Sequence, residues 1–230
     1  KRIIVTEPKR INAINIPQEI IQHNKEFELG LNIGYSTGII KRLPDESGII
    51  FMTTGSLLQR LVNIKDSDSF SNKYDYILID EVHLHDVEID FLLMEIKNLL
   101  DTNWKNPQCP NIILMSATLK VQKYQEYFDS PHFIEITGQS FPIVEVWPET
   151  SPTNSEEYIV NMIQKYNKSG SDNFGDVLIF MPNMFSMKKL KEYLDKQLKG
   201  YEIVLLSGGN IASSEIVPIF DRMRNVKSNP

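Results

Sequence analysis

The stretch YILIDEVHLHD, residues 76–86, sets a short apolar run directly before two adjacent acids. Such a run predicts a strand buried on both faces, as in a parallel sheet covered by helices. Ligands of an open parallel sheet bind outside the carboxyl ends of its strands. We therefore expect Asp80 and Glu81 to hold Mg²⁺ and to polarise a water for attack on a phosphate. Taken alone, two acids after a strand more often form a helix N-cap followed by a favourable charge.

Similar apolar runs recur along the chain and alternate with helical stretches, which predicts the α/β class with parallel sheets. The runs lie at 3–5, 49–52, 76–79, 112–115, 177–181 and 203–206. The helical stretches include 55–64 and 88–100, the second with an apolar stripe at Ile89, Leu92, Leu93, Ile96 and Leu100. In the second half, stripes fall at Tyr158, Ile159, Met162, Ile163 and Tyr166, and at Met187, Leu190, Leu194 and Leu198, with Gly200 as a helix stop. We interpret these stripes as core faces.

A change of composition at residues 138–155 separates the two halves of the chain. This segment combines prolines, a glycine and many serines and threonines, which is typical of a junction between domains. The sequence therefore predicts one domain over 1–140, a linker over 141–155 and the start of a second domain over 156–230.

Composition narrows the class of protein. The chain has 230 residues, 41% hydrophobic residues and a formal net charge of −6, so it is globular and lacks a global positive field for nucleic acid. Its single cysteine, Cys109, excludes an internal disulfide or a cysteine-based zinc site. No apolar run approaches the roughly 20 residues that span a bilayer. We expect an intracellular protein without a membrane partner.

Polar groups follow the other expected strands. Ser116 and Thr118 flank a small residue after 112–115 and can link the acids to a second domain by hydrogen bonds. The run at 3–5 leads into hydroxyl and cationic residues, and the run at 49–52 leads into Thr53, Thr54 and Gly55. Hydroxyls, backbone amides and cations at helix starts bind phosphodiester backbones.

The ordered set of these segments resembles the DExH/DEAH-box helicases of superfamily 2, and most closely the viral, poxvirus-type nucleoside triphosphatase/RNA helicases. VTEPKR resembles motif Ia, MTTGSLLQRL motif Ib, IDEVH motif II and MSAT motif III. FDSPHFIEITGQSFPIVEVW resembles the family's linker, GDVLIFMPN its motif IV, and LLSGG a short RNA-contacting turn. Cellular DEAH-box helicases are the near alternative.

The resemblance implies roles for individual residues and a fold of two RecA-like domains. Asp80 and Glu81 would bind Mg²⁺, Glu81 would also activate the attacking water, and His83 would relay the nucleotide state. Ser116 and Thr118 would couple hydrolysis to strand separation. The cofactors implied are ATP, or another NTP, and Mg²⁺. RNA, and possibly DNA, would be contacted without sequence specificity by Thr6, Lys9, Arg10, Thr53, Thr54, Gly55, Ser207 and Gly208.

Three family motifs are missing from these residues: the phosphate-cradling loop, and motif V and the arginine-finger motif VI of the second domain. No Gly-Lys dipeptide occurs, so the phosphate-cradling loop is absent, and no Gly-Arg pair marks the second domain's arginine-finger motif. We therefore expect both domains to be incomplete, the first at its N-terminal P-loop part and the second at its C-terminal part. Glu7 also replaces the family's usual Gln, beside the expected RNA path, and Lys9 replaces the commoner Arg.

The leading hypothesis is a portion of an ATP-dependent RNA helicase that couples NTP hydrolysis to 3′-to-5′ translocation and unwinding of RNA duplexes. The alternative is a non-catalytic helicase-like module that binds RNA or a protein partner. We expect the parent protein to be an RNA-stimulated NTPase and the 230 residues alone to be inactive. The protein would be cytoplasmic or virion-associated if viral, and nuclear if it is a cellular DEAH-box protein.

Overall fold

A computed structural model describes residues 1–44, 47–63, 73–103, 105–117, 121–129, 132–136, 138, 141–168 and 176–206. The chain divides into two compact units, Lys1–Ile136 and Thr137–Pro230. The finer division into 1–140, 141–155 and 156–230 stays a prediction. Each unit is described by itself.

Unit 1 is built on a six-stranded sheet with the order β3-β2-β4-β1-β5-β6. Every neighbouring pair is parallel except β2 and β3, which are antiparallel. The mainly parallel α/β sheet predicted from the apolar runs is therefore confirmed for this unit. The strands are β1 Arg2–Glu7, β2 Ile33–Ser36, β3 Lys41–Arg42, β4 Gly48–Thr53, β5 Tyr76–Ile79 and β6 Asn111–Leu114.

The register brings the carboxyl ends of four strands to one edge. Thr6 of β1 lies opposite Met52 of β4 and Ile79 of β5, and Ile79 lies opposite Leu114 of β6. Because these strands are parallel, the residues that follow them leave the sheet on the same side.

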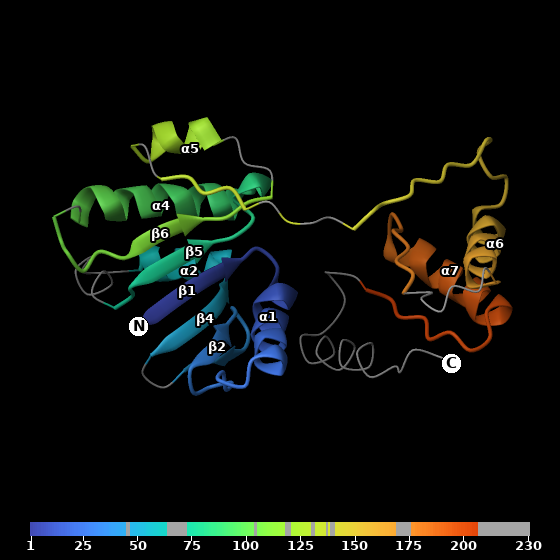
Figure 1. Cartoon of the computed structure of the whole chain (residues 1–230), viewed down its shortest axis with the longest axis horizontal. Coiled ribbons are helices and arrows are strands. Elements are labelled where there is room, and N and C mark those ends of the chain that lie inside the picture. The colour runs from blue at the N-terminus through green and yellow to red at the C-terminus, as the bar shows by residue number, and fades with distance from the viewer. Residues whose placement is uncertain are drawn as a thin grey trace. The chain divides into compact units, whose positions relative to one another are not determined.

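The helices among the described residues of unit 1 are α1 Arg10–His23, α2 Thr54–Val62, the short 3₁₀ helix η1 Val82–Leu84, α4 Val87–Asn103 and α5 Val121–Tyr127. The helices predicted at 55–64 and 88–100 thus form within about three residues of the expected ends. Figure 1 shows α1 beside β2 and β4. In the described part of the chain, no helix combines the length and apolar character needed to cross a membrane.

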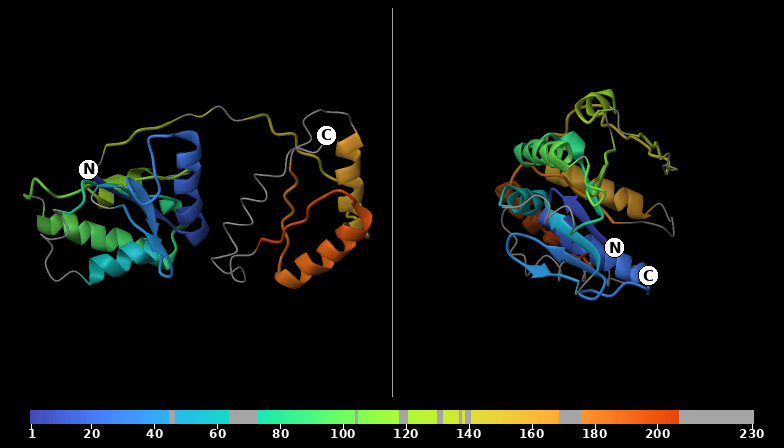
Figure 2. Two further views of the ribbon diagram at one scale, coloured as in Figure 1. Left: turned by 90° about the horizontal axis from the view of Figure 1, so that it is seen from below. Right: turned by 90° about the vertical axis from the view of Figure 1, so that its left-hand side faces the viewer.

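The two faces of the sheet bury different apolar clusters. One cluster packs α2, α4 and Tyr124 of α5 on one face, and the other packs α1 on the opposite face. Figure 2 shows α1 and α4 on opposite sides of the sheet. The predicted stripe of α4 faces this core, with Ile89, Leu92, Leu93 and Ile96 buried and Leu100 packed at the margin.

Unit 2 contains α6 Ser155–Lys168 and α7 Met184–Gln197, which pack around a small apolar core (Figure 1). Its buried residues are Val160, Ile163, Leu190, Leu194 and Leu198. Gly200 has a φ of 88° just beyond α7, as expected of a helix stop. The prediction of strands at 177–181 and 203–206 is wrong for the described residues, because neither run pairs with a neighbouring strand there.

Candidate functional site

The edge formed by the carboxyl ends of the strands gathers the predicted catalytic residues and Ser116, the one predicted coupling residue among those that the structure describes. The amide of Asp80 donates to the carbonyl of Thr6 at 3.2 Å, and the amide of Met115 donates to the carbonyl of Ile79 at 2.8 Å. The backbone that carries Ser116 is thereby held against the end of β5. The acids of the 76–86 stretch and the hydroxyl after β6 therefore belong to one site.

The two acids lie in the turn between β5 and η1, where Glu81 takes the N-cap position of η1 but makes no side-chain cap to it. Asp80 Oδ1 accepts a 2.8 Å hydrogen bond from the amide of Glu81, and Glu81 has a left-handed backbone with a φ of 57°. A non-glycine residue in this region costs on the order of 1 kcal/mol. Asp86, not Asp80, accepts from the amide of Ile89 in the first turn of α4, at 2.8 Å. The helix-cap alternative for Asp80 is therefore wrong.

His83 connects the acids to the residue that follows β6. Its Nδ1 lies 3.3 Å from Glu81 Oε2 and 3.1 Å from Ser116 Oγ. Both oxygens can accept from an Nδ1–H, and the carboxylate can only accept when ionised. A change in charge at Glu81 would therefore alter the hydrogen bond at Ser116, because the same imidazole ring contacts both side chains.

Glu7, at the end of β1, is the acid whose surroundings are most unusual. Its side chain is 2% exposed, so it does not line an open RNA path as we expected. Burial first, and then the negative charges of Asp80 and Glu81, together raise the pKa of Glu7 from 4.5 to about 7, against a hydrogen bond from Asn12 that lowers it. Near neutral pH this carboxyl is therefore partly protonated.

Replacing Glu7 with glutamine is expected to stabilise the metal-free chain, with a gain that grows from about pH 5 to about pH 8. The unfolded state releases the proton at a pKa of 4.5 and the folded state at about 7, so wild-type stability falls as pH rises through this window. The loss is at most about 3 kcal/mol at roughly 1.4 kcal/mol per unit. The glutamine side chain is never ionised, so the variant does not lose this stability as the pH rises. Urea unfolding in the presence of a chelator measures the difference, and identical pH profiles for the two proteins would contradict the assignment.

Tyr124 of α5 supports the turn that holds the acids. Its hydroxyl donates to the carbonyl of Val82 at 3.0 Å, and its ring stacks on His85 with centroids 6.4 Å apart. Burial and, second, the charge of Asp90 raise the pKa of Tyr124, so the hydroxyl keeps its proton. Sequence analysis missed this residue, because no local pattern links positions 42 residues apart.

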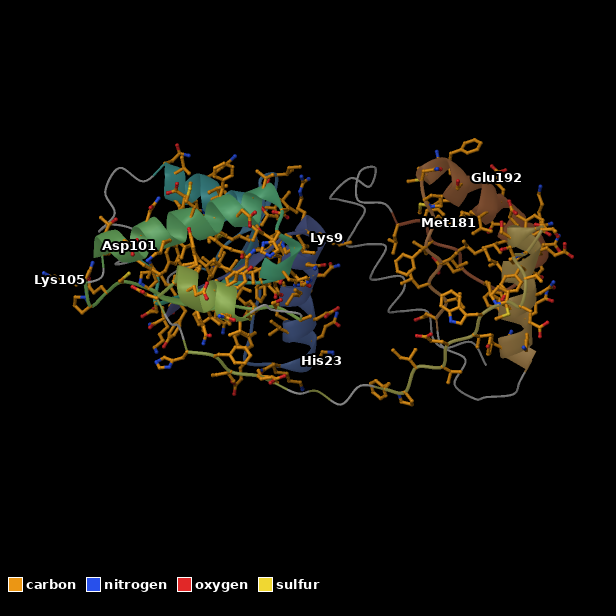
Figure 3. All side chains as sticks on the ribbon, turned by 90° about the horizontal axis from the view of Figure 1, so that it is seen from above. Lys9, His23, Asp101, Lys105, Met181 and Glu192 are labelled. Atoms are coloured by element: carbon orange, nitrogen blue, oxygen red, sulfur yellow. The ribbon has the colours of Figure 1, made fainter. Side chains whose placement is uncertain are left out.

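The described residues that were predicted to bind RNA differ in exposure: two are exposed, two are buried, and Thr53 and Gly55 are half-buried. Lys9 and Arg10 are exposed at the start of α1, where Figure 3 labels Lys9 at one end of the helix and His23 at the other. Thr6 and Thr54 are 0% and 1% exposed, and their hydroxyls have no hydrogen-bond partner. A phosphate would reach these two hydroxyls only if neighbouring residues moved.

The start of α2 combines the predicted motif residues with an acid from α4. Thr53 Oγ1 lies 2.7 Å from Ser56 Oγ, and Thr53 makes no side-chain cap to the backbone of the helix. A side chain at Gly55 would place its Cβ 2.9 Å from a carboxylate oxygen of Glu88. Glu88 was not predicted, because its position shows no motif. Thr118, Ser207 and Gly208 lie outside the described residues.

The carboxylates of this edge suit a magnesium ion that is bound together with a nucleotide. Within the described residues, no group of three or more His, Cys, Asp or Glu side chains is arranged to hold a metal. Mg²⁺ needs no such group, since it keeps waters and is held by one or two carboxylates and substrate phosphates. The repulsion that Asp80 and Glu81 exert on Glu7 indicates where a cation would be favoured. The assignment of Asp80 and Glu81 as the residues that bind magnesium stays a prediction.

Comparisons with known proteins show a matching family and several similar helicases. The model of a family described as DEAD/DEAH box helicase matches residues 1–127. The ATP-dependent RNA helicase HrpA homolog of Haemophilus influenzae is 27% identical over 224 residues, which cover 97% of this chain and 16% of that protein. ATP-dependent RNA helicase TDRD9 of Homo sapiens is 30% identical over 214 residues, covering 88% and 15%. Putative RNA Helicase B962L of African swine fever virus is 30% identical over 210 residues, covering 85% and 21%. The chain thus spans about a fifth or less of the length of these relatives.

Proposed function

Because this chain belongs to the DEAD/DEAH box helicase family, we propose that it supplies part of the NTP-hydrolysing core of an ATP-dependent RNA helicase. The observation that carries the proposal is the grouping of Asp80, Glu81, His83 and Ser116 at the carboxyl edge of the parallel sheet. The relatives named as RNA helicases support the substrate class.

The acids divide the chemistry of hydrolysis between them. Glu81 accepts the proton of the attacking water while the water oxygen forms a bond to the terminal phosphorus and the bond to the leaving nucleotide diphosphate breaks. Asp80 would hold the metal when it is bound, and His83 orients the Glu81 carboxylate through the 3.3 Å contact. Mg²⁺, when bound, neutralises charge on the phosphates.

Coupling to RNA would pass through Ser116 and Thr118. The 3.1 Å contact between Ser116 and His83 joins the hydrolytic residues to the segment after β6. When Glu81 gains or loses charge, its contact with His83 changes, and the hydrogen bond between His83 and Ser116 changes as a result. Thr118 is proposed to take part in the same coupling as Ser116.

RNA would bind along the same edge of the sheet through its phosphates. The cations of Lys9 and Arg10 and the amides at the start of α2 are the groups of unit 1 that suit this ligand. Ser207 and Gly208 would contribute from the second domain. Such contacts do not read the base sequence, so RNA of any sequence would bind, with DNA as a second nucleic-acid ligand. The protein is proposed to be intracellular. It would be cytoplasmic or virion-associated if it is viral, and nuclear if it is a cellular DEAH-box protein.

Movement of the full-length protein is proposed to run 3′-to-5′ on RNA. We expect unwinding of a duplex with a 3′ single-stranded overhang and little unwinding of the same duplex with a 5′ overhang, because the protein must load on the strand along which it moves. A strand-displacement assay with ATP and Mg²⁺ measures both. Equal unwinding of the two duplexes would contradict the polarity.

A non-catalytic module that binds RNA or a protein partner is the second candidate. These 230 residues contain no Gly-Lys dipeptide and hence no phosphate-cradling loop, so taken by themselves they fit a binding module. RNA binding by a full-length protein that shows no hydrolysis would establish this alternative.

A further inference from the structure

Tyr124 of α5 contacts both ends of the short helix η1, which carries His83. Its hydroxyl donates to the carbonyl of Val82 at 3.0 Å, and its ring stacks on His85 with an interplanar angle of 16°. The side chain is 8% exposed and belongs to the apolar cluster that packs α2 and α4 on the sheet. The tyrosine therefore has a fixed place against the turn that follows β5.

Val82 is held at both of its backbone polar groups. Its amide donates to the carbonyl of Met115, the residue after β6, at 3.2 Å, and its carbonyl accepts from Tyr124. The first contact fixes the peptide plane between Glu81 and Val82, and the second fixes the plane between Val82 and His83. The end of β6 and helix α5 thus orient the two residues that flank Val82.

η1 lies between two residues with an unfavourable backbone conformation. It begins after Glu81, with a φ of 57°, and ends before His85, with a φ of 49°. Left-handed residues other than glycine persist only where the surrounding structure holds them. Tyr124 contacts the residue after Glu81 with its hydroxyl and His85 with its ring, so it helps to hold both ends of the turn.

The hydroxyl of Tyr124, and not its ring, distinguishes orientation of the turn from filling of the core. A phenylalanine ring would occupy the same place and could stack on His85. Only the hydroxyl reaches the carbonyl of Val82, a residue that is 0% exposed. A buried acceptor that loses its donor costs free energy, so the backbone would shift to find another partner.

Resting on the proposed hydrolytic function of this edge, we propose that Tyr124 is a positioning residue for ATP hydrolysis and acts through His83. Its hydroxyl holds the peptide that leads from Val82 into His83. The imidazole is thereby kept 3.3 Å from Glu81 Oε2 and 3.1 Å from Ser116 Oγ. Without the hydroxyl, Glu81 remains as the base, but the contact that orients its carboxylate is loosened.

The test is single-turnover ATP hydrolysis by the full-length protein with RNA and Mg²⁺, because slow rates can be measured in this way. We expect Tyr124→Phe to lower the rate on the order of tenfold, since a buried hydrogen bond that orients the site is lost while no reacting group is removed. Affinity for a fluorescent ATP analogue should be unchanged. Tyr127→Phe is the matched control, because it removes the same hydroxyl from the same helix at a residue that is 46% exposed. It should hydrolyse ATP at the wild-type rate.

A double substitution shows whether the effect passes through His83. In a His83→Ala background, Tyr124→Phe should cause no further loss of rate, because the side chain that the hydroxyl positions is already gone. Two losses that multiply would show that Tyr124 acts by another route, and the proposed role would be wrong.

The outcomes separate this inference from the function on which it rests. If Tyr124→Phe hydrolyses ATP at the wild-type rate while Glu81→Gln does not, the positioning role is wrong and the hydrolytic site stands. If the wild-type protein does not hydrolyse ATP, both proposals fall. Equal losses in Tyr124→Phe and Tyr127→Phe would contradict a specific role of the hydroxyl at Val82. A Tyr124→Phe protein that circular dichroism shows to be unfolded at the assay temperature would give the hydroxyl a purely structural role, which also contradicts the proposal.

Discussion

Replacing Glu81 with glutamine in the full-length protein is expected to lower RNA-stimulated ATP turnover by about 10²–10⁴-fold while ATP binding is retained. Glutamine keeps the shape of the side chain and can still meet His83 Nδ1, which lies 3.3 Å from Glu81 Oε2 in the wild-type protein. It cannot accept the proton of the attacking water. Phosphate release measures turnover, and binding of a fluorescent ATP analogue measures affinity.

The matched control for this change is Glu95→Gln, which alters the charge equally but lies on α4, away from the turn that holds the acids. We expect it to hydrolyse ATP at the wild-type rate. Unchanged hydrolysis by the Glu81 variant would remove Glu81 from the role of base. Loss of ATP binding together with turnover would show instead that its carboxylate is needed to hold the nucleotide.

Replacing Leu92 with alanine is expected to lower the free energy of unfolding of unit 1 by about 2–5 kcal/mol. Leu92 is 0% exposed and belongs to the cluster that packs α4 and α2 on the sheet. Truncation removes buried methyl groups and leaves a cavity. Denaturant unfolding of the 230-residue chain, followed by circular dichroism, measures the change.

Phe91→Ala is the control for the core, since Phe91 is the neighbouring residue of α4 and is 52% exposed. An exposed aromatic contributes little to packing, so we expect a change within about 1 kcal/mol. Equal destabilisation by the two substitutions would show that the predicted apolar stripe does not define the core face of α4.

The parallel core of unit 1 was predictable because β1, β4, β5 and β6 each contain an uninterrupted apolar run. β2 was missed, since its sequence IGYS contains a glycine and a serine and shows no apolar run. No range was predicted for α1, whose interior carries Pro17, a residue that usually ends a helix. In both cases packing against the sheet outweighs local preference.

The edge site was predictable in outline, because acids and hydroxyls that follow parallel strands meet at the same edge. The burial of Thr6 and Glu7 was not predictable from the sequence, since their exposure depends on how α1 covers the end of β1. Tyr124 and Glu88 act on residues far away in the sequence, Val82 and Gly55. Such contacts follow from the tertiary fold and leave no local pattern.

The central claim is that the acids after β5 are the hydrolytic half of an RNA-dependent motor. Its most direct test is steady-state ATP hydrolysis by the wild-type full-length protein, with and without single-stranded RNA. The account predicts Mg²⁺-dependent hydrolysis that rises several-fold on addition of RNA. Absence of hydrolysis with RNA and Mg²⁺ present, in a folded protein, would contradict it.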